Sequence, residues 1–524
     1  MRTRNIHLVL GSLVLVGRFA QAQLIDQTKA PNVEGDGIRK SYAEQIGAGR
    51  GDWSTPDSSS FIIARDPFRA IRRGRQLFNR KFTKEQGVGP IVGDGRGDIN
   101  TKLEIGAGLS DSCAGCHGLP RGSAGFGGVV VTRPDGRNAP HLFGLGLREM
   151  LGDEITAELR ARRDEAIAMA RTRQTRIVRP MTAKGLDYGE IVANPDGTVD
   201  LSKVTGVDRD LRVRPFFAHG GTFSIREFIV GALQNEMGMQ AVDPELAQAA
   251  GGSRIVTPAG MTLDGALDKL DPPPAADSSA DRDGDGVANE APQAVVDFME
   301  FYLLNYFKPA HGEQNEVTAH GREVFKQVGC PSCHVGNLQV DWDRRVADVE
   351  TVYDPVKGIF NNLFATAIPL FETVSDSTGL PEVKRPSMKP FLVRDIFTDF
   401  KRHDLGPNFH ERDYDGTMRK EFMTLPLWGV GSTPPYGHDG RSMTLNDVIL
   451  RHGGEAQASR DAYAALGRLD RQDLLEFLNS LILFPPDHTA SNLNSGDRNA
   501  ADFPQRGHGS IFLTVLFNNP RDPE

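Results

Sequence analysis

The sequence carries one pattern twice, as Cys113-Ala114-Gly115-Cys116-His117 and as Cys330-Pro331-Ser332-Cys333-His334. Together the two segments use all four cysteines of the chain. Cys-x-x-Cys-His is the attachment pattern of c-type haem, in which two thiols bind one edge of the macrocycle and the histidine binds the iron as proximal ligand. We therefore predict two covalently bound c-type haems, one held by Cys113, Cys116 and His117 and the other by Cys330, Cys333 and His334.

Paired cysteines have two other common uses. A thioredoxin-like redox pair usually lies on a βαβ pattern, and neither segment has such surroundings. A structural zinc site needs four ligands, so it would have to join the two segments across the long stretch between them. The repetition of the full five-residue pattern favours haem over both.

Apolar residues around the second motif predict a cytochrome-like helical frame. Val324, Phe325 and Val328 share one helical face, and Gly329 should end that helix directly before Cys330. A similar segment, Gly74 to Phe78, precedes the first motif, but a loop rich in Gly and Asp (Gly87 to Gly108) comes between them.

Each motif is also followed by an apolar helix that stops near a proline. The first runs from Val295 to Tyr306, and the second should begin at Asp470 as N-cap. We predict a mainly α fold with two cytochrome c-like haem domains and long loop insertions. The predicted parts are a signal peptide (1–22), a first haem domain (23–310), a second haem domain (311–486) and a C-terminal tail (487–524).

The N-terminus resembles a secretory signal. Arg2 and Arg4 precede an apolar run from Leu8 to Val16, and Ala20-Gln21-Ala22 is a small-residue cleavage site. That run is too short to span a bilayer, and no other segment could do so, which predicts no transmembrane segment in the mature chain. We therefore expect a periplasmic or otherwise exported protein.

The charge composition limits which classes of molecule the protein is expected to bind. The 524 residues carry a formal net charge of -9 and no long basic stretch, which argues against nucleic acid as a partner. A mild acidic excess suits a basic redox partner but equally suits plain solubility. We expect a redox partner such as a small cytochrome or cupredoxin, with peroxide as a candidate small-molecule substrate.

An aspartate-rich loop follows a proline-rich linker between the motifs. Asp281, Asp283 and Asp285 alternate and Gly286 follows, as in the first half of a calcium-binding loop. The twelfth position is Pro292, which cannot bind a cation, so Asn289 or Glu290 would have to complete the shell. The prediction is one structural calcium ion; the alternative is an acidic turn that caps the next helix.

The sixth ligand of each iron decides between catalysis and electron transfer, because an open position admits a small molecule. For the second haem the candidates are Met423, Met418 and His438. Met423 is the preferred distal iron ligand, against the alternative of core packing. The candidates for the first haem are His141, His219, Met237 and Met239.

The densest polar cluster lies late in the chain, from Tyr436 to Arg441, and is followed by His452-Gly453-Gly454-Glu455. We interpret it as a loop at the haem edge, with His438 handling protons and Arg441 pairing with a propionate. These two are the predicted catalytic residues; a well-capped surface turn is the alternative.

Several stretches resemble the di-haem oxidoreductase family, relatives of the bacterial di-haem cytochrome c peroxidases. They are, in order, Ser112 to His117, Asn138 to Leu147, the acidic loop, the second haem motif, His403 to Gly406, Pro426 to Gly431, and His438 to Arg441 with His452 to Ala456. The resemblance implies a mostly α-helical di-haem oxidoreductase, often described as a peroxidase, whose haems exchange electrons.

The same resemblance implies a tryptophan after the first motif and between the haems. Here Trp53 precedes the first motif, and Trp342 and Trp428 follow the second, so another aromatic such as Phe143 would have to take that place. Three functions stay open: a peroxidase-like oxidoreductase, a pure electron-transfer cytochrome, and a haem subunit of a larger periplasmic redox complex. Insertions that a simple electron carrier does not need favour the enzyme.

Overall fold

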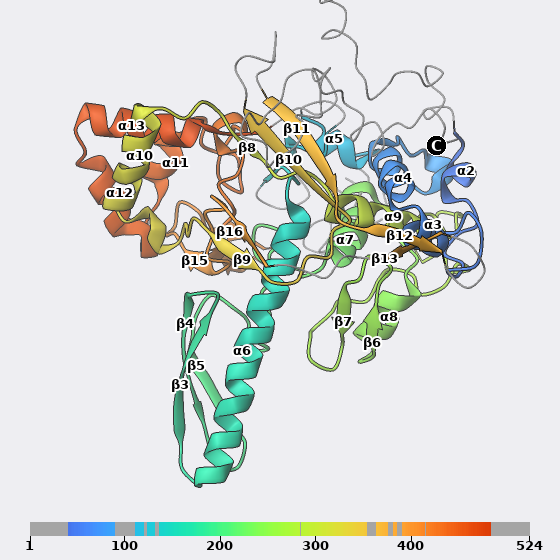
Figure 1. Cartoon of the computed structure of the whole chain (residues 1–524), viewed down its shortest axis with the longest axis horizontal. Coiled ribbons are helices and arrows are strands. Elements are labelled where there is room, and N and C mark those ends of the chain that lie inside the picture. The colour runs from blue at the N-terminus through green and yellow to red at the C-terminus, as the bar shows by residue number, and fades with distance from the viewer. Residues whose placement is uncertain are drawn as a thin grey trace, which may run out of the picture.

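The computed structural model describes residues 40–89, 110–119, 123–130, 136–282, 284–353, 363–375, 381–384, 390–413 and 416–483. The predicted signal peptide, most of the Gly- and Asp-rich loop, Asp283 and the C-terminal tail lie outside these ranges. The described part has more helix than strand, and its sheets are small, with two or three strands each (Figure 1). No helix in these ranges is long and apolar enough to cross a membrane.

The first haem unit is built on two crossing helices, α4 (Pro67–Asn79) and α9 (Gln293–Leu304). At the crossing, Gly74 lies so close to α9 that a Cβ there would come within 2.1 Å of the Phe298 carbonyl oxygen. Helix α9 is buried from Ala294 to Leu304, and its two carboxylates, Asp297 and Glu300, each pair with the buried Arg226 at 2.9 Å. A third helix, α7 (Ile225–Met237), also packs against α9.

The second unit repeats this crossing with α10 (Glu316–Gln327) and α13 (Arg468–Asn479). Gly321 is the close-approach residue, since its Cβ would lie 1.9 Å from the Asp473 carbonyl oxygen. Helix α10 ends before Gly329, whose φ of 87° is left-handed, as predicted. The predicted start of α13 was wrong: Gly467 is the N-cap, and Asp470 lies in the first turn, where its charge favours the helix dipole.

The two haem motifs lie in short helical turns. The first forms α5 (Cys113–His117), which the Ser112 hydroxyl caps by accepting from the Gly115 amide. The second forms a 3₁₀ turn, η2 (Cys330–Ser332), directly after α10. A tight turn is what allows two thiols and one imidazole to face the same space.

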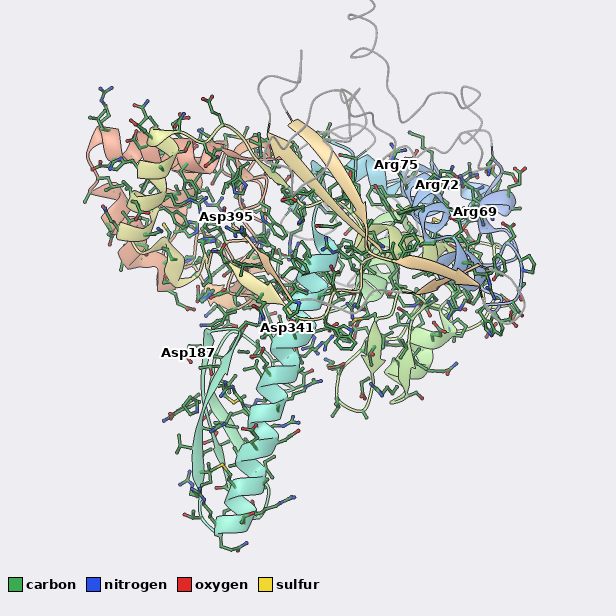
Figure 2. The ribbon with its side chains drawn as sticks, viewed as in Figure 1. Arg69, Arg72, Arg75, Asp187, Asp341 and Asp395 are labelled. Carbon is green, nitrogen blue, oxygen red and sulfur yellow. The ribbon has the colours of Figure 1, made fainter. Side chains whose placement is uncertain are left out.

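One insertion projects from the body as an arm (Figure 1). It consists of the long helix α6 (Leu145–Arg173) and a sheet of β3 (Ile177–Ala183), β4 (Leu186–Ala193) and β5 (Val199–Val204) in antiparallel order. Lys184 fixes the base of the arm to the second unit by pairing with Glu154 at 2.7 Å and with Asp341, the latter labelled in Figure 2.

A second insertion returns to the first unit although it follows the second haem motif. Its hairpins are β10 (Ala347–Tyr353) with β11 (Leu363–Pro369), and β12 (Glu372–Ser375) with β13 (Pro381–Lys384). Val346, Ala347 and Val349 join the core of the first unit, and Phe371 meets Phe68 edge to face. The two units are thus connected by more than the chain between them.

The remaining described elements are short. They are α2 (Tyr42–Ile46), α3 (Ser59–Arg65), η1 (Lys84–Gln86), β1 (Gly127–Val130), β2 (Arg137–Ala139), α8 (Pro244–Ala250), β6 (Arg254–Val256), β7 (Thr262–Asp264), β8 (Ala310–His311), β9 (Leu338–Val340), β14 (Phe391–Val393), β15 (Arg402–Asp404), β16 (Glu411–Arg412), β17 (Met418–Arg419), β18 (Glu421–Met423), η3 (Val430–Ser432), α11 (Leu445–Arg451), η4 (Gly454–Ala456), α12 (Gln457–Ala464) and β19 (Leu481–Ile482).

Candidate di-haem site

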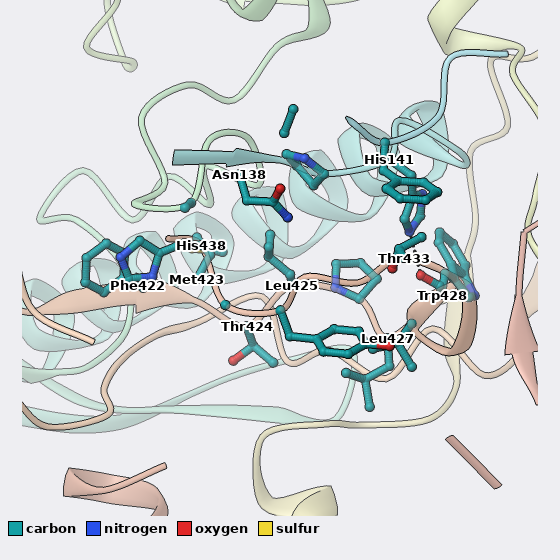
Figure 3. A pocket seen from close by; sticks show the side chains of 18 of the residues that line it. Asn138, His141, Phe422, Met423, Thr424, Leu425, Leu427, Trp428, Thr433 and His438 are labelled. Carbon is teal, nitrogen blue, oxygen red and sulfur yellow. Dashed lines mark hydrogen bonds between the residues drawn. The ribbon is translucent and has the colours of Figure 1, made fainter. Parts of the chain in front are cut away.

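Both Cys-x-x-Cys-His motifs open on one continuous cavity of about 430 Å³. The lining is mainly apolar and comes from both units. Figure 3 shows the segment from Phe422 to Trp428 running along the cavity, with His438 beside Phe422 at one end and His141 beside Trp428 at the other. A mostly apolar cavity with a few polar groups is the usual form of a cofactor site.

The predicted proximal histidines are held in the same way in both motifs. His117 Nδ1 lies 2.8 Å from the Pro140 carbonyl oxygen, and His334 Nδ1 lies 3.1 Å from the Phe397 carbonyl oxygen. A carbonyl can only accept, so Nδ1 carries the proton and Nε2 keeps its lone pair. This is the arrangement that metal-binding histidines need. Burial also lowers the pKa of both imidazoles, which keeps them neutral.

The cysteines fit haem better than zinc. Burial raises the pKa of Cys113 and of Cys330 to about 12, so both thiols stay protonated at neutral pH. Zinc needs thiolates, whereas the haem bond leaves a neutral thioether. Among the described residues, the one group with metal-ligand spacing is Cys333, Asp399 and His403, which contains no cysteine of the first motif. The residues present therefore fit two haems.

A backbone repeat flanks the cavity on both sides. In the first unit an antiparallel bridge joins Phe216 to Thr222, Ser224 caps α7, and the helix starts at Ile225. In the second unit the bridge joins Tyr436 to Ser442, and Thr444 caps α11, which starts at Leu445. Corresponding residues follow at the same intervals, so the two segments present equivalent positions to the two motifs.

The eighth residue from each helix start lines the cavity, and here the units differ in side chain and in backbone, since this residue lies inside α7 but is the extended C-cap residue after α11. It is His452 in the second unit and Ala232 in the first. His452 Nδ1 lies 2.7 Å from the Val448 carbonyl oxygen, which again leaves Nε2 with its lone pair. His452 is close enough to His334 for each charge to disfavour the other, since a charge on His452 lowers the His334 pKa. An alanine offers no ligand atom.

The sequence had suggested His452 only as part of a polar loop, not as a ligand. Met423, the preferred distal ligand, lines the cavity, but its sulfur lies against Gly220 of the first unit. Met418 is 46% exposed and does not line the cavity. The choice of Met423 stays a prediction.

The candidates for the first iron are spread out. Met237 lines the cavity, whereas His219 and Met239 do not. His141 lines it too, but its Nε2 lies 2.5 Å from the Trp428 carbonyl oxygen. That nitrogen is therefore a hydrogen-bond donor rather than a free ligand.

The two predicted catalytic residues lie in different places. His438 lines the cavity, stacks on Phe422 with ring centroids 3.9 Å apart, and has Nε2 3.4 Å from a Glu411 carboxylate oxygen. Arg441 has a 58% exposed side chain near Asp439 and is not part of the cavity lining. Arg451 forms the closer pair with Asp439, at 2.7 Å. Catalytic roles for His438 and Arg441 stay predictions.

Residues 337–481 match the model of a protein family described as "Di-haem oxidoreductase, putative peroxidase". This segment, which is less than half of the chain, is therefore similar to a di-haem oxidoreductase domain. The match confirms the family resemblance and includes His403, His438 and His452. No curated protein matches the chain.

Two solved structures are similar in outline. Hydrazine synthase of Kuenenia stuttgartiensis, pressurised with xenon, is 14% identical, with 83% of this chain and 95% of that chain covered and a TM-score of 0.35. A MauG-like protein associated with microbial copper homeostasis is 13% identical, with 68% and 93% covered and a TM-score of 0.23. At these TM-scores neither similarity supports a conclusion about this chain.

Within the segment that matches the family model, His403 is a buried imidazole between two carboxylates. Its Nε2 lies 2.8 Å from Asp399 and its Nδ1 lies 2.7 Å from Glu455. Burial alone would lower the pKa of His403, but the hydrogen bonds, first of all with Asp399, raise it to about 11. The second haem site therefore has a fixed positive charge beside Cys333.

The first haem site has a carboxylate that the sequence did not indicate. Glu236 of α7 lines the cavity near Cys116, where its charge raises the pKa of that thiol in addition to the larger effect of burial. It lies one helical turn beyond Ala232, which places the two on the same helix face. A helix pattern with both a small residue and a carboxylate facing a cofactor could have been a signal.

In the acidic loop, the binding of calcium stays a prediction. Asp281 accepts hydrogen bonds from the Gly284 and Gly286 amides at 2.8 and 3.1 Å, and Asp285 accepts from the Val287 amide at 2.7 Å. Glu290 is directed elsewhere, since it accepts from the Gln240 amide at 2.7 Å. Asp283 lies outside the described residues.

Proposed function

We propose that the chain is an exported di-haem peroxidase-type oxidoreductase with two unequal irons. In this proposal His334 and His452 bind the second iron, which receives electrons, while the first iron keeps an open position where peroxide is reduced. The observation that carries the proposal is the exchange of His452 for Ala232 at equivalent positions of the repeat. A haem with two strong ligands mostly passes electrons, and one with a free position reacts.

The reaction consumes one hydrogen peroxide, two electrons and two protons and forms two waters. A haem held by Cys113, Cys116 and His117 would supply the iron chemistry of this reaction. Glu236 is the group that we assign to proton transfer, because its carboxylate lines the cavity on the side of Ala232. Phe217 and Phe228, which also line the cavity there, limit the access of water. The electrons come from a small redox protein outside the cytoplasm.

Met237 supports a second candidate function. Its thioether lines the cavity on the same helix as Ala232. If Met237 binds the first iron, both irons have six ligands and the chain is an electron-transfer cytochrome.

Electron paramagnetic resonance of the holoprotein at each stage of reduction tests the two candidates. The peroxidase proposal predicts one high-spin haem and one low-spin haem, and a Soret shift on adding hydrogen peroxide. Two low-spin haems in every redox state, with no response to peroxide, would contradict it and support the cytochrome.

Replacing Glu236 with glutamine keeps the shape of the side chain but removes the acid. We expect peroxide to react about 100-fold more slowly at the first haem, within the usual range for a lost general acid or base. The matched control is Glu421→Gln, because Glu421 is exposed and does not line the cavity. An unchanged peroxide rate in Glu236→Gln would remove Glu236 from the mechanism.

A further inference from the structure

The two proximal histidines are connected by a chain of peptide groups and hydrogen bonds. At the first motif, the Pro140 carbonyl that accepts from His117 belongs to the peptide group preceding His141. At the second motif, the Phe397 carbonyl that accepts from His334 follows Ile396 in the chain. Two hydrogen bonds then connect His141 to Ile396 through residues 427–428. His141 Nε2 meets the Trp428 carbonyl oxygen at 2.5 Å, and the Leu427 amide donates to the Ile396 carbonyl at 3.2 Å.

His141 is the one side chain in this connection apart from the two proximal ligands. The other links are backbone groups of residues 140, 396–397 and 427–428. The connecting segment 427–428 belongs to the strip along the cavity in Figure 3, where His141 and Trp428 are side by side. The route therefore passes along the wall of the cavity and not through its space.

The protonation state of His141 suits a fixed link. Burial lowers its pKa to about 4, so the imidazole is neutral at physiological pH. The Trp428 carbonyl requires the proton on Nε2, and Nδ1 is buried with no hydrogen-bond partner among the residues that the structure describes. A single tautomer with a single partner holds the ring in one orientation.

Trp428 contributes its carbonyl and not its indole. The indole packs against Gly144 and belongs to the apolar core at the base of the arm. Phe143 meets the His141 ring at 6.0 Å and the Tyr306 ring at 4.9 Å, so it leads into the first unit and away from the second motif. Neither aromatic ring provides a route as continuous as the hydrogen-bonded one.

We propose that this connection, with His141 as its positioning residue, is the electron route between the two haems. The inference rests on the proposed pair of haems but not on the reaction with peroxide. Each transfer moves one electron: the second iron is oxidised from ferrous to ferric, and the first is reduced from ferric to ferrous. No proton moves along the route and no bond is formed or broken. The bonded route is favoured because electrons tunnel more readily across covalent bonds and short hydrogen bonds than across empty space.

The test uses two amides of different length at residue 141 in the full-length holoprotein. The glutamine amide nitrogen of His141→Gln matches Nε2 and can donate to the Trp428 carbonyl. The shorter side chain of His141→Asn places its nitrogen near the former Nδ1, out of reach of that carbonyl. His141→Leu removes the donor and keeps the volume.

The readout is the inter-haem electron-transfer rate after a pulse of photochemical reductant, without peroxide. Redox potentials and spin states are measured on the same samples. We expect His141→Gln to keep the wild-type rate and His141→Asn and His141→Leu to slow it by about tenfold or more, the usual cost of losing a second-shell contact at a metal site. Wild-type rates in both, or a slowing that the measured potentials account for, would overturn the proposal.

Trp428→Phe separates the carbonyl from the indole, because it keeps the backbone and removes the larger ring. We expect its inter-haem rate to stay near that of the wild type. A loss in Trp428→Phe together with a normal rate in His141→Leu would assign the route to the indole. The peroxide experiment fails or succeeds independently, since no peroxide is present here.

Discussion

The two halves of the backbone repeat, residues 216–232 and 436–452, have the same fold and opposite chemistry. Both make a bridged turn, place a hydroxyl at the helix N-cap, and present the eighth residue from the helix start to the cavity, although that residue lies inside α7 in one half and directly after α11 in the other. One half presents His452 there and the other presents Ala232. In the proposed function, this one difference in side chain makes the two irons unequal, although the two segments begin with the same bridge and cap.

The largest expected effect comes from breaking the motif itself. Replacing Cys330 and Cys333 together with serine should leave no covalent haem at the second site, because serine forms no thioether. Denaturing gels stained for haem and the mass of the unfolded chain measure this. Retention of two covalent haems would contradict the assignment, and the matching pair Cys113 and Cys116 gives the same comparison for the first unit.

The next largest effect is expected from exchanging the side chains at residues 232 and 452. His452→Ala should convert the second haem from low-spin to high-spin, because it removes the proposed sixth ligand. Ala232→His should make the first haem low-spin and insensitive to peroxide. Electron paramagnetic resonance reports both changes.

The control for this exchange is His320→Ala. Its side chain is 51% exposed and pairs with Asp473 outside the cavity, so the spin state should not change. If the second haem stays low-spin in His452→Ala, His452 is not the sixth ligand, and Met423 becomes the preferred candidate.

The helix crossings allow the stability of the two units to be compared. Gly74→Ala and Gly321→Ala each force a Cβ against a backbone carbonyl, at 2.1 and 1.9 Å. Backbone moves less readily than a flexible side chain, so each change should lower the free energy of unfolding by about 1–3 kcal/mol. Thermal unfolding measures the loss. Gly89→Ala, where nothing lies within 4 Å and no helix begins, is the control, and an equal loss there would remove the close approach as the cause.

The smallest effect concerns the charged histidine of the second unit. Because the pKa of His403 is raised to about 11 in the folded state, the folded chain holds a proton that the unfolded chain releases near its ordinary pKa of 6.5. The stabilisation is complete below pH 6.5 and is lost as pH rises through 11.

His403→Gln should therefore flatten the decline in unfolding free energy from about pH 7 to 10. We expect a difference of about 1 kcal/mol, since Glu455 is 54% exposed and its contribution is screened. Chemical unfolding at a series of pH values measures it. Parallel curves for His403→Gln and the wild type would show that the charge does not contribute.

Local patterns predicted the parts of the fold that depend on neighbouring residues. The haem turns and the helices around Val324 and Val295 follow from spacing alone. The start of α13 was misplaced because both Gly467 and Asp470 can stand at a helix start, and packing of Leu474 and Phe477 decides between them. The arm at residues 145–204 was not predicted, although residues 199–202 alternate between apolar and polar, and its packing against α6 is a contact that only the fold shows.

Site residues were predicted where all the ligands of a haem motif lie in one short segment. They were missed where the site combines residues from two distant segments. His117 and His334 follow from their motifs. His452 could not be chosen from the sequence, because its partner His334 is more than a hundred residues away and only the fold brings them together. Ala232 is informative only beside His452, and that comparison depends on the matching bridges and helix starts of the two segments.

The shared cavity has a consequence for how the protein is made in the cell. Since both motifs open on a single space, we expect each of the proposed porphyrins to cover part of that space for the other. A chain that has received only one haem leaves apolar surface uncovered in both halves, and uncovered apolar surface favours unfolding and proteolysis. We therefore expect a chain with one haem, such as the variant without Cys330 and Cys333, to be recovered in lower yield than a chain with both cofactors.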